Sequence, residues 1–155
     1  MVTEEQNKAV VRRFIEEMWN QRKLELADEL FAQDCVTHQL RGGEDSTGAP
    51  RSPDLVKREA AGWLAAFPDL KFDIKQMIAA DDQVVSRYTM HGTHIGPWLG
   101  VAPTERSVSV PMMTIHRVRD GKIVEDWVFV GTLTLLQQLG LVPETSEIIE
   151  RALKR

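Results

Sequence analysis

The sequence has little of several features that would mark a specialised class of protein. It contains 1 cysteine, so no disulfide can form within the chain. No apolar run approaches the roughly 18 residues that a membrane-spanning helix needs. We find no internal repeat and no low-complexity tract. The chain is therefore not expected to be a disulfide-stapled, membrane-spanning or repeat protein.

Basic charge is also scarce. Lys and Arg number 19 against 23 Asp and Glu, which gives a formal net charge of -4. The adjacent basic residues at 12–13, 57–58 and 154–155 are isolated pairs rather than a continuous stripe. We therefore expect no nucleic-acid partner.

Residues 1–6 have neither the basic stretch nor the apolar stretch of a secretory leader. Together with the single Cys35, this favours a cytoplasmic protein. Cys35 itself is expected to be a small buried hydrophobic residue, because no histidine lies at a spacing typical of a cysteine nucleophile.

What the chain does have is enough apolar surface for a core. Hydrophobic residues make up 43% of 155 residues, which fits one domain spanning residues 1–155. A chain of this length buries roughly 70% of its unfolded surface.

Apolar residues at helical spacing predict helices in the first part of the chain. The first helix begins at Thr3, which forms a capping box with Gln6, and runs to about Arg22. A second, shorter helix covers residues 24–33.

The next elements are separated by a polar segment. Residues 36–40 predict a short strand, and the glycine-rich residues 41–50 predict a loop long enough to form a lid. A third helix begins after the cap Ser52, with Pro53 in its first turn, and ends before Pro68.

The remaining sequence alternates as strands do. Four strands are predicted at residues 70–75, 84–93, 107–119 and 122–130, with turns at 81–82 and 120–121. Helices follow at 133–139 and around 148–153. Helices first and an antiparallel meander second predict an α+β domain with a cone-shaped cavity between its two layers.

Asp126 is the most informative single residue. Its strand alternates so clearly that Asp126 shares one face with Val124, Val128 and Val130. The other face is equally apolar, so the alternation leaves open which face is buried. Burial would raise the pKa of this carboxyl and make it a better general base near neutral pH.

The histidines allow two interpretations. His91 and His94 are three apart on a strand and point to opposite faces, so we expect no metal site. His38 and His116 are either hydrogen-bonded residues near strand ends or members of a pocket wall.

Several apolar residues are equally ambiguous. Trp19, Trp63, Phe67 and Met112 are either core residues or one wall of an apolar pocket, and Thr114 shares the face of Met112.

Four segments carry a family resemblance. They read GTHIGPWLGVAPT at 92–104, VSVP at 108–111, HRVRDGKIVEDW at 116–127 and LLQQLG at 135–140. In these segments the chain resembles the SnoaL-like polyketide cyclase family of the NTF2-like superfamily, and weaker similarity extends over most of the chain.

The resemblance implies a cone-shaped α+β barrel and an intramolecular aldol condensation without cofactor or metal. Asp126 would remove a proton from an activated methylene, and a histidine, here His116, would hold the ketone oxygen as charge develops. The ligand would be a small apolar or polyketide-like molecule bound among Trp19, His38, Trp63, Phe67, Met112 and Thr114.

Two departures from the family pattern bear on this assignment. Many relatives carry an acid just before the LLQQLG helix, where this chain has Val130, Gly131 and Thr132. The family's pocket histidine falls on either Met112 or His116. Three function classes therefore remain: a cyclase, a hydroxylase or hydrolase on the same scaffold, and a non-enzymatic binding protein.

We also expect a homodimer. The face of the sheet that the helices do not cover should carry Tyr88, Met90 and Ile115, which are too apolar to face water alone.

Overall fold

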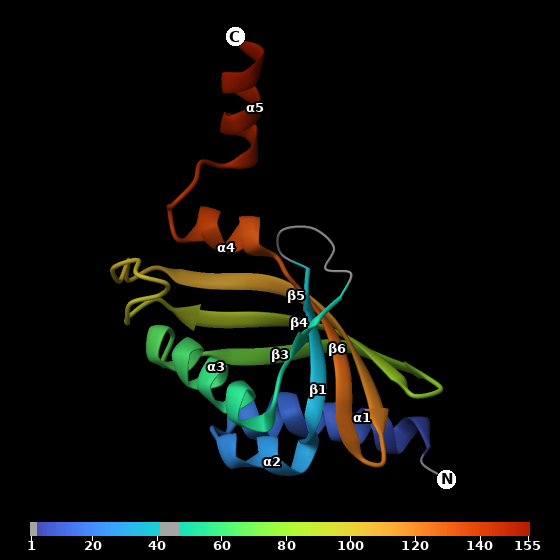
Figure 1. Cartoon of the computed structure of the whole chain (residues 1–155). Helices are drawn as coiled ribbons and strands as arrows, with labels where there is room; N and C mark the ends of the chain where they lie inside the picture. Colours follow the sequence, from blue (N-terminus) through green and yellow to red (C-terminus); the bar gives the residue numbers. More distant parts are fainter. Residues whose placement is uncertain (1–2, 41–46) are drawn as a thin grey trace.

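The computed structural model describes residues 3–40 and 47–155. A six-stranded curved sheet, in the order β2-β1-β6-β5-β4-β3, forms one layer, and helices cover one of its faces (Figure 1). The α+β architecture expected from the sequence is confirmed.

The first helical segment changes its winding half-way. Helix α1 (Glu4–Arg13) begins with the predicted capping box, in which Thr3 and Gln6 bond each other's backbone. It continues as a π-helical segment, η1 (Phe14–Asn20), where a plain helix to about Arg22 was expected. The Asn20 side chain then donates to the backbone oxygen of Phe72 and accepts from its backbone nitrogen, which anchors the end of the segment to the sheet.

The helix predicted over residues 24–33 ends earlier in the structure, at Leu30. A 3-10 turn, η2 (Leu24–Leu26), and α2 (Ala27–Leu30) lead directly into strand β1 (Phe31–Gln39). Strand β1 pairs in parallel with β6 (Lys122–Val130), with Phe31 opposite Ile123. Phe31 is spaced as a helical residue, but its pairing with β6 makes it the first residue of a strand. Because β1 and β6 are parallel, the sheet is mixed rather than wholly antiparallel.

The polar segment between β1 and the third helix falls partly outside the described residues, so the expected lid over 41–50 is described only from residue 47. Within it, the short strand β2 (Ala49–Pro50) pairs with β1. Helix α3 (Pro53–Ala66) begins as predicted, with the Ser52 hydroxyl accepting from the Leu55 backbone nitrogen.

The predicted meander is confirmed. Strands β3 (Lys71–Ala80), β4 (Gln83–Thr93), β5 (Ser107–Arg119) and β6 pair antiparallel in sequence order. At the β5–β6 turn, Asp120 and Gly121 have φ of 50° and 73°, the left-handed pair that a tight hairpin requires.

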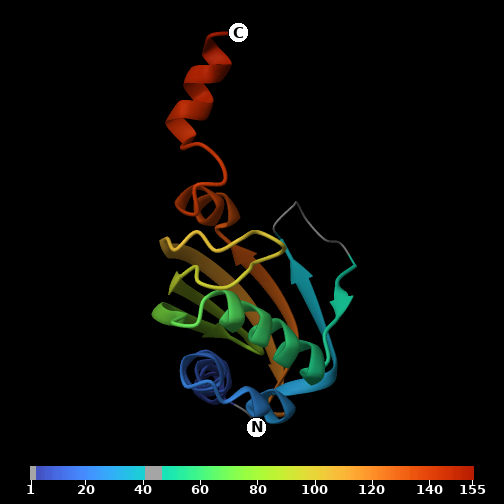
Figure 2. The ribbon, with the colours of Figure 1, turned by 90° about the vertical axis from the view of Figure 1, so that its left-hand side faces the viewer.

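The chain ends in two helices, α4 (Thr132–Gln138) and α5 (Thr145–Leu153). Leu135 and Leu139 are buried, whereas α5 projects from the body and buries none of its residues (Figures 1 and 2). In the described part of the chain, no helix is long and apolar enough to cross a membrane.

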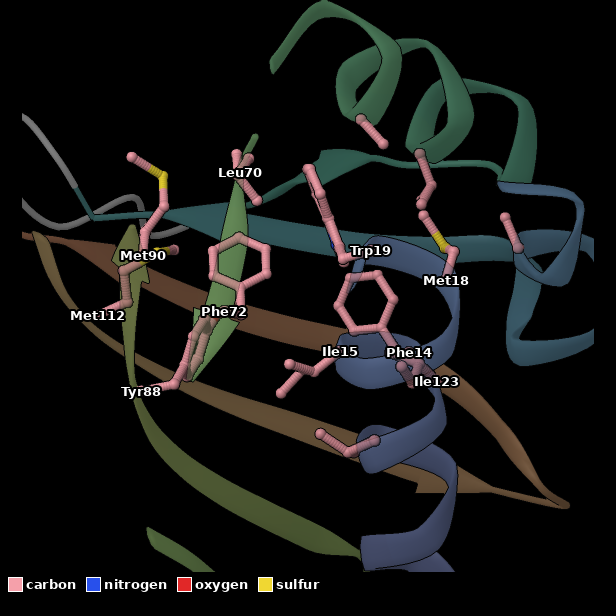
Figure 3. Packing of buried hydrophobic residues seen from close by; sticks show 14 of the residues in the cluster. Phe14, Ile15, Met18, Trp19, Leu70, Phe72, Tyr88, Met90, Met112 and Ile123 are labelled. Atoms are coloured by element: carbon pink, nitrogen blue, oxygen red, sulfur yellow. The ribbon is translucent and has the colours of Figure 1, made fainter. Parts of the chain in front are cut away.

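The core lies between the helices and the concave face of the sheet. Side chains from α1 and η1, including Phe14, Ile15 and Trp19, meet those of Phe72 and Tyr88 from the strands (Figure 3). Tyr88 and Met90 are 5% and 2% exposed, so their expected place on the uncovered face is wrong. Both side chains lie on the face of β4 that packs against the helices, and period-2 spacing alone does not say which side of a strand is buried.

Candidate active site

A cavity of about 440 Å³ opens between the helices and the concave face of the sheet. Most of its wall is apolar, with aromatic rings from Phe14, Trp19, Trp63, Phe72 and Trp98. Figure 3 shows part of this wall, where Trp19 of η1 lies opposite the strands that carry Phe72, Tyr88, Met90 and Met112. The polar or charged members of the wall are Gln39, Arg51, Arg58, Glu59, Tyr88, Thr114 and His116.

Asp126 is fully buried at 0% exposure, beside this cavity rather than in its lining. A register shift between Arg117 and Val118 of β5 marks a bulge in the pairing with β6. Ile123 and Asp126 are consequently both buried, whereas Val124, expected on the face of Asp126, is only half-buried.

Both oxygens of the Asp126 carboxylate accept hydrogen bonds. The Thr37 hydroxyl donates to Oδ1 at 2.5 Å, and Arg51 Nη1 donates to Oδ2 at 2.8 Å. The Gln39 amide in turn donates to Thr37 Oγ1 at 3.0 Å, so the hydroxyl proton of Thr37 is directed at the carboxylate. These contacts occupy both oxygens and fix the orientation of the carboxylate inside the protein.

Arg51 links two carboxylates. Its Nε donates to Glu59 Oε2 at 2.8 Å while Nη1 holds Asp126, and its guanidinium lies 5.8 Å from the centre of the Phe31 ring. The residue is only 7% exposed. Burial by itself lowers the pKa of Arg51, but the charges of Asp126 and Glu59 outweigh it, and the net pKa is raised. The guanidinium is therefore permanently charged.

His116 lies opposite Asp126 in the β5–β6 pairing and forms part of the cavity wall. It is 1% exposed, its ring packs edge-on against Phe14, and Nδ1 lies 3.4 Å from Thr114 Oγ1. Burial lowers the pKa of His116 to about 4, against a smaller opposing effect of Asp126. The imidazole is therefore neutral at neutral pH.

Tyr88 adds a second neutral polar group to the wall. Burial raises the pKa of its phenol, and a hydrogen bond with Thr114 opposes that shift. Because its proton stays bound, the phenol can serve as a hydrogen-bond donor.

The structure brings together most, but not all, of the residues predicted to form the pocket. Trp19, Trp63, Met112, Thr114 and His116 line the cavity. The two candidates for the pocket histidine position, Met112 and His116, thus lie in the same wall, two strand positions either side of Thr114.

Two predicted lining residues lie elsewhere. The Nε2 atom of His38 is 3.0 Å from Glu125 Oε1, and its ring stacks on Trp127 at 5.0 Å, which places it on the opposite side of β1 from Thr37. Phe67 is buried against Trp63 and His94. His38 points away from the cavity because successive residues of a strand point to opposite faces. Phe67 does not line the cavity because its ring packs against the rings of Trp63 and His94.

Cys35 is buried, as expected. Burial raises the pKa of its thiol to about 12, which leaves it protonated. Among the described residues, no three His, Cys, Asp or Glu side chains are grouped as a metal site would require.

Comparison with known proteins identifies the family. The model of the SnoaL-like polyketide cyclase family matches residues 9–139. The chain belongs to the SnoaL-like polyketide cyclase family. A search of curated proteins gives no match.

Solved structures of related proteins agree with this family assignment and with its NTF2-like fold. IdmH, a putative polyketide cyclase from Streptomyces antibioticus, is 33% identical, with a TM-score of 0.74 over 87% of this chain and 99% of that one. AclR, a putative hydroxylase from Streptomyces galilaeus, is 31% identical, with a TM-score of 0.78 over 97% of this chain and 90% of that one. A SnoaL-like protein from Jannaschia sp. CCS1, 22% identical over 90% of this chain and 95% of that one, has the same fold with a TM-score of 0.78.

Gly131 lies in the segment 130–132, just before the LLQQLG helix, where an acid was considered from the family resemblance. A Cβ atom there would lie 3.0 Å from the Pro111 backbone oxygen, and the Gly131 nitrogen already donates to that oxygen. The close approach of the two backbones favours glycine at this position, and Asp126 is the buried carboxylate that remains near the cavity.

Arg51, Glu59, Gln39, Thr37 and Tyr88 were missed by sequence reasoning. Arg51 follows a polar loop and looks like an ordinary surface arginine. It reaches Asp126 because β2 pairs with β1 and β1 pairs with β6. The alternation of β1 offers one signal that could have been used, since Thr37 and Gln39 share a face.

Proposed function

We propose that the protein is a cyclase that closes a ring by intramolecular aldol addition, with Asp126 as the proton acceptor and donor. The observation that carries the proposal is a fully buried carboxylate beside a cavity with an apolar, aromatic wall and a neutral histidine. Family membership supports a cyclase-type activity. The reaction class needs no cofactor, because a methylene between two carbonyls is already acidic.

The cavity suits a small, flexible, largely apolar substrate. Its volume of about 440 Å³ lies within the range of roughly 300–1,000 Å³ usual for small-molecule sites. Rings from η1 and α3 face the strands across it, so an extended polyketone would have to fold to fit. Holding the methylene next to the ketone of the same molecule supplies much of the rate advantage.

The proposed reaction conserves atoms. Asp126 takes a proton from the activated methylene, and the electron pair of the broken C–H bond moves onto the neighbouring carbonyl oxygen as an enolate. The enolate carbon then bonds to the ketone carbon, and the resulting alkoxide takes the proton back from Asp126. The product of this step is an isomer of the substrate.

His116 and Tyr88 are placed to assist at the ketone. Both line the cavity, and both are neutral for the reasons given above. A neutral imidazole or phenol can donate a hydrogen bond to the ketone oxygen as it becomes an alkoxide, and a donor buried in an apolar wall acts more strongly than one in water.

Substitution of Asp126 tests the proposal. Asp126→Asn should lower the rate of ring closure of a synthetic keto-ester bearing a second ketone by roughly 10² to 10⁴, the usual contribution of one general acid-base group. Chromatography with mass detection would follow the isomeric product. Glu147→Gln, which makes the same chemical change on the projecting α5, is the matched control. Unchanged turnover in Asp126→Asn would assign the proton transfer to another group.

A hydroxylase on the same scaffold is the second candidate, because AclR is 31% identical over nearly the whole chain. The two reactions differ in their need for oxygen. Ring closure should proceed equally in anaerobic buffer, whereas a product heavier by one oxygen atom that forms only in air would favour the hydroxylase.

We further propose that the protein is a cytoplasmic homodimer. The outer face of the sheet exposes Ile78, Val85, Met113 and Phe129 at 54%, 37%, 51% and 52%, beside half-buried Ile115. These residues lie on four neighbouring strands and are paired across them as Ile78 with Val85 and Met113 with Phe129. Apolar side chains gathered in this way favour burial against a second copy.

A further inference from the structure

Arg51 is bonded to the proposed base and also lines the cavity where the substrate would bind. We propose that Arg51 exchanges anionic partners during the reaction, holding Asp126 in the resting protein and the enolate oxygen of the substrate once Asp126 has taken the proton. This inference rests on the proposed function and adds a subsite for an anionic oxygen to it.

The guanidinium is fixed from several directions. The backbone nitrogen of Arg51 donates to the Cys35 oxygen at 2.7 Å, which ties the residue to β1. Nε is held by Glu59 from α3, and the group lies over the Phe31 ring. A cation held in this way need not reorganise when charge develops nearby.

Part of the guanidinium remains available to a ligand. Arginine has five N–H donors, of which one on Nε and one on Nη1 are used by Glu59 and Asp126. Among the residues that the structure describes, none accepts a hydrogen bond from Nη2. Because the side chain forms part of the cavity wall, its remaining donors can reach a molecule bound there.

The charge count explains why the subsite would select the enolate over the uncharged substrate. Arg51 carries one positive charge between two carboxylates, so a further anion beside it is opposed while Asp126 is ionised. When the proton moves from the substrate carbon to Asp126, the negative charge leaves Asp126 and appears on the substrate oxygen. The total charge around Arg51 is unchanged, and the attraction that held Asp126 becomes available to the enolate.

A consequence is that any anion bound in this subsite should bring a proton with it. The titratable or charged groups surrounding Asp126 come from four elements and one linker: Cys35 from β1, Glu59 from α3, Tyr88 from β4, His116 from β5, and Arg51 from the segment between β2 and α3. Cys35 and Tyr88 are already protonated at neutral pH, and His116 stays neutral there. The groups that can take up the proton are therefore the carboxylates of Asp126 and Glu59 and the neutral imidazole of His116, and of these the two carboxylates are bonded to Arg51.

Binding of two matched probes tests the exchange without any turnover. 2-Naphthoate carries a delocalised pair of oxygens like that of an enolate, and 2-naphthamide is its uncharged counterpart of the same shape. Calorimetry at pH 7 in two buffers of different ionisation enthalpy counts the protons taken up on binding. We expect close to one proton per naphthoate and none per naphthamide.

Variants identify the residue that takes up the proton and the cation that binds the anion. Asp126→Asn resembles the protonated carboxyl, so it should bind naphthoate about ten-fold or more tightly than the wild type and take up no proton. Glu59→Gln should retain the proton uptake. The Asp126→Asn protein should prefer naphthoate over naphthamide. Adding Arg51→Met to it should abolish this preference, whereas adding Arg51→Lys should retain part of it.

Several results would overturn the exchange. They are naphthoate binding without proton uptake, weaker naphthoate binding by Asp126→Asn, loss of uptake in Glu59→Gln but not in Asp126→Asn, or loss of the preference on changing Arg58 instead of Arg51. Ring closure is measured separately. A wild-type protein that closes the ring but shows any of these results would retain the proposed function and lack the subsite.

Discussion

Removing either half of the Arg51–Asp126 pair should destabilise the protein strongly. The two groups are 2.8 Å apart, and their side chains are 8% and 0% exposed. Removing one partner of a buried pair costs about 3–5 kcal/mol, because the other charge is left uncompensated. In Asp126→Asn the guanidinium retains Glu59, so we expect the lower end of this range. In Arg51→Met the carboxylate retains only the Thr37 hydroxyl, so we expect the upper end.

The double variant Arg51→Met/Asp126→Asn leaves neither charge at the Arg51–Asp126 contact. Its loss of stability should be smaller than the sum of the two single losses by about 2 kcal/mol or more. Urea unfolding measures the three free energies. At about 2–4 °C per kcal/mol for a chain of this size, each single change should also lower Tm by roughly 6–20 °C.

Arg58→Met is the control for loss of an arginine from the same region. Arg58 is exposed and forms no ion pair with any described residue, so its removal should change the free energy of unfolding by less than about 0.5 kcal/mol. Single changes at Arg51 and Asp126 that cost under about 1 kcal/mol, or that add independently, would refute the view that the pair is buried and coupled.

Other parts of the structure make further predictions. His116 has its pKa lowered from 6.5 to about 4, so the unfolded chain binds the proton first, and stability present above pH 6.5 should be lost by up to about 3 kcal/mol as pH falls towards 4. His116→Gln should lack this part of the pH dependence in urea unfolding. Phe129→Asp on the outer face should convert a dimer into a 17.6 kDa species in light scattering. Gly96→Ala should destabilise the fold, because its Cβ would lie 2.1 Å from the Ala65 backbone oxygen. A Cβ at Gly62 would have no other atom within 4 Å, so Gly62→Ala should stabilise α3 by about 1 kcal/mol.

Each of these predictions can be contradicted by one result. An identical pH dependence in His116→Gln would mean that the imidazole is not buried neutral. A wild-type protein that scatters as a single copy at micromolar concentration would remove the dimer. Equal thermal stability of the two alanine variants would contradict the close packing of residue 96 on α3.

Much of the fold could be predicted because its signals are local. The capping box at Thr3, the Ser52 cap and the Asp120-Gly121 turn each depend on neighbouring residues, and all three form as expected. The end of the second helix could not be predicted, because residues from Phe31 onward are drawn into β1 by pairing with the distant strand β6. The assignment of Tyr88 to the uncovered face was wrong for a related reason, since the side of a strand that is buried is set by what packs on it.

The candidate site divides in the same way. The apolar and aromatic part of the wall was largely anticipated, since Trp19, Trp63 and Met112 stand out in the sequence. The polar network was not, because Arg51 and Thr37 reach Asp126 across sequence separations of 75 and 89 residues. The bulge that turns Val124 away from Asp126 likewise arises from the register between β5 and β6. The catalytic roles of Asp126 and His116 stay predictions.

Proton exchange at carbon tests the central claim most directly. A β-keto ester without a second ketone cannot cyclise, but Asp126 should still remove its methylene proton. In D₂O the methylene carbon should therefore exchange its hydrogen for deuterium. We predict that the wild-type protein accelerates this exchange, followed by proton NMR, and that Asp126→Asn lowers the accelerated rate by roughly 10² to 10⁴ while still binding 2-naphthamide. Exchange at the rate of buffer alone, or equal exchange by wild type and Asp126→Asn, would contradict the assignment of Asp126 as the base.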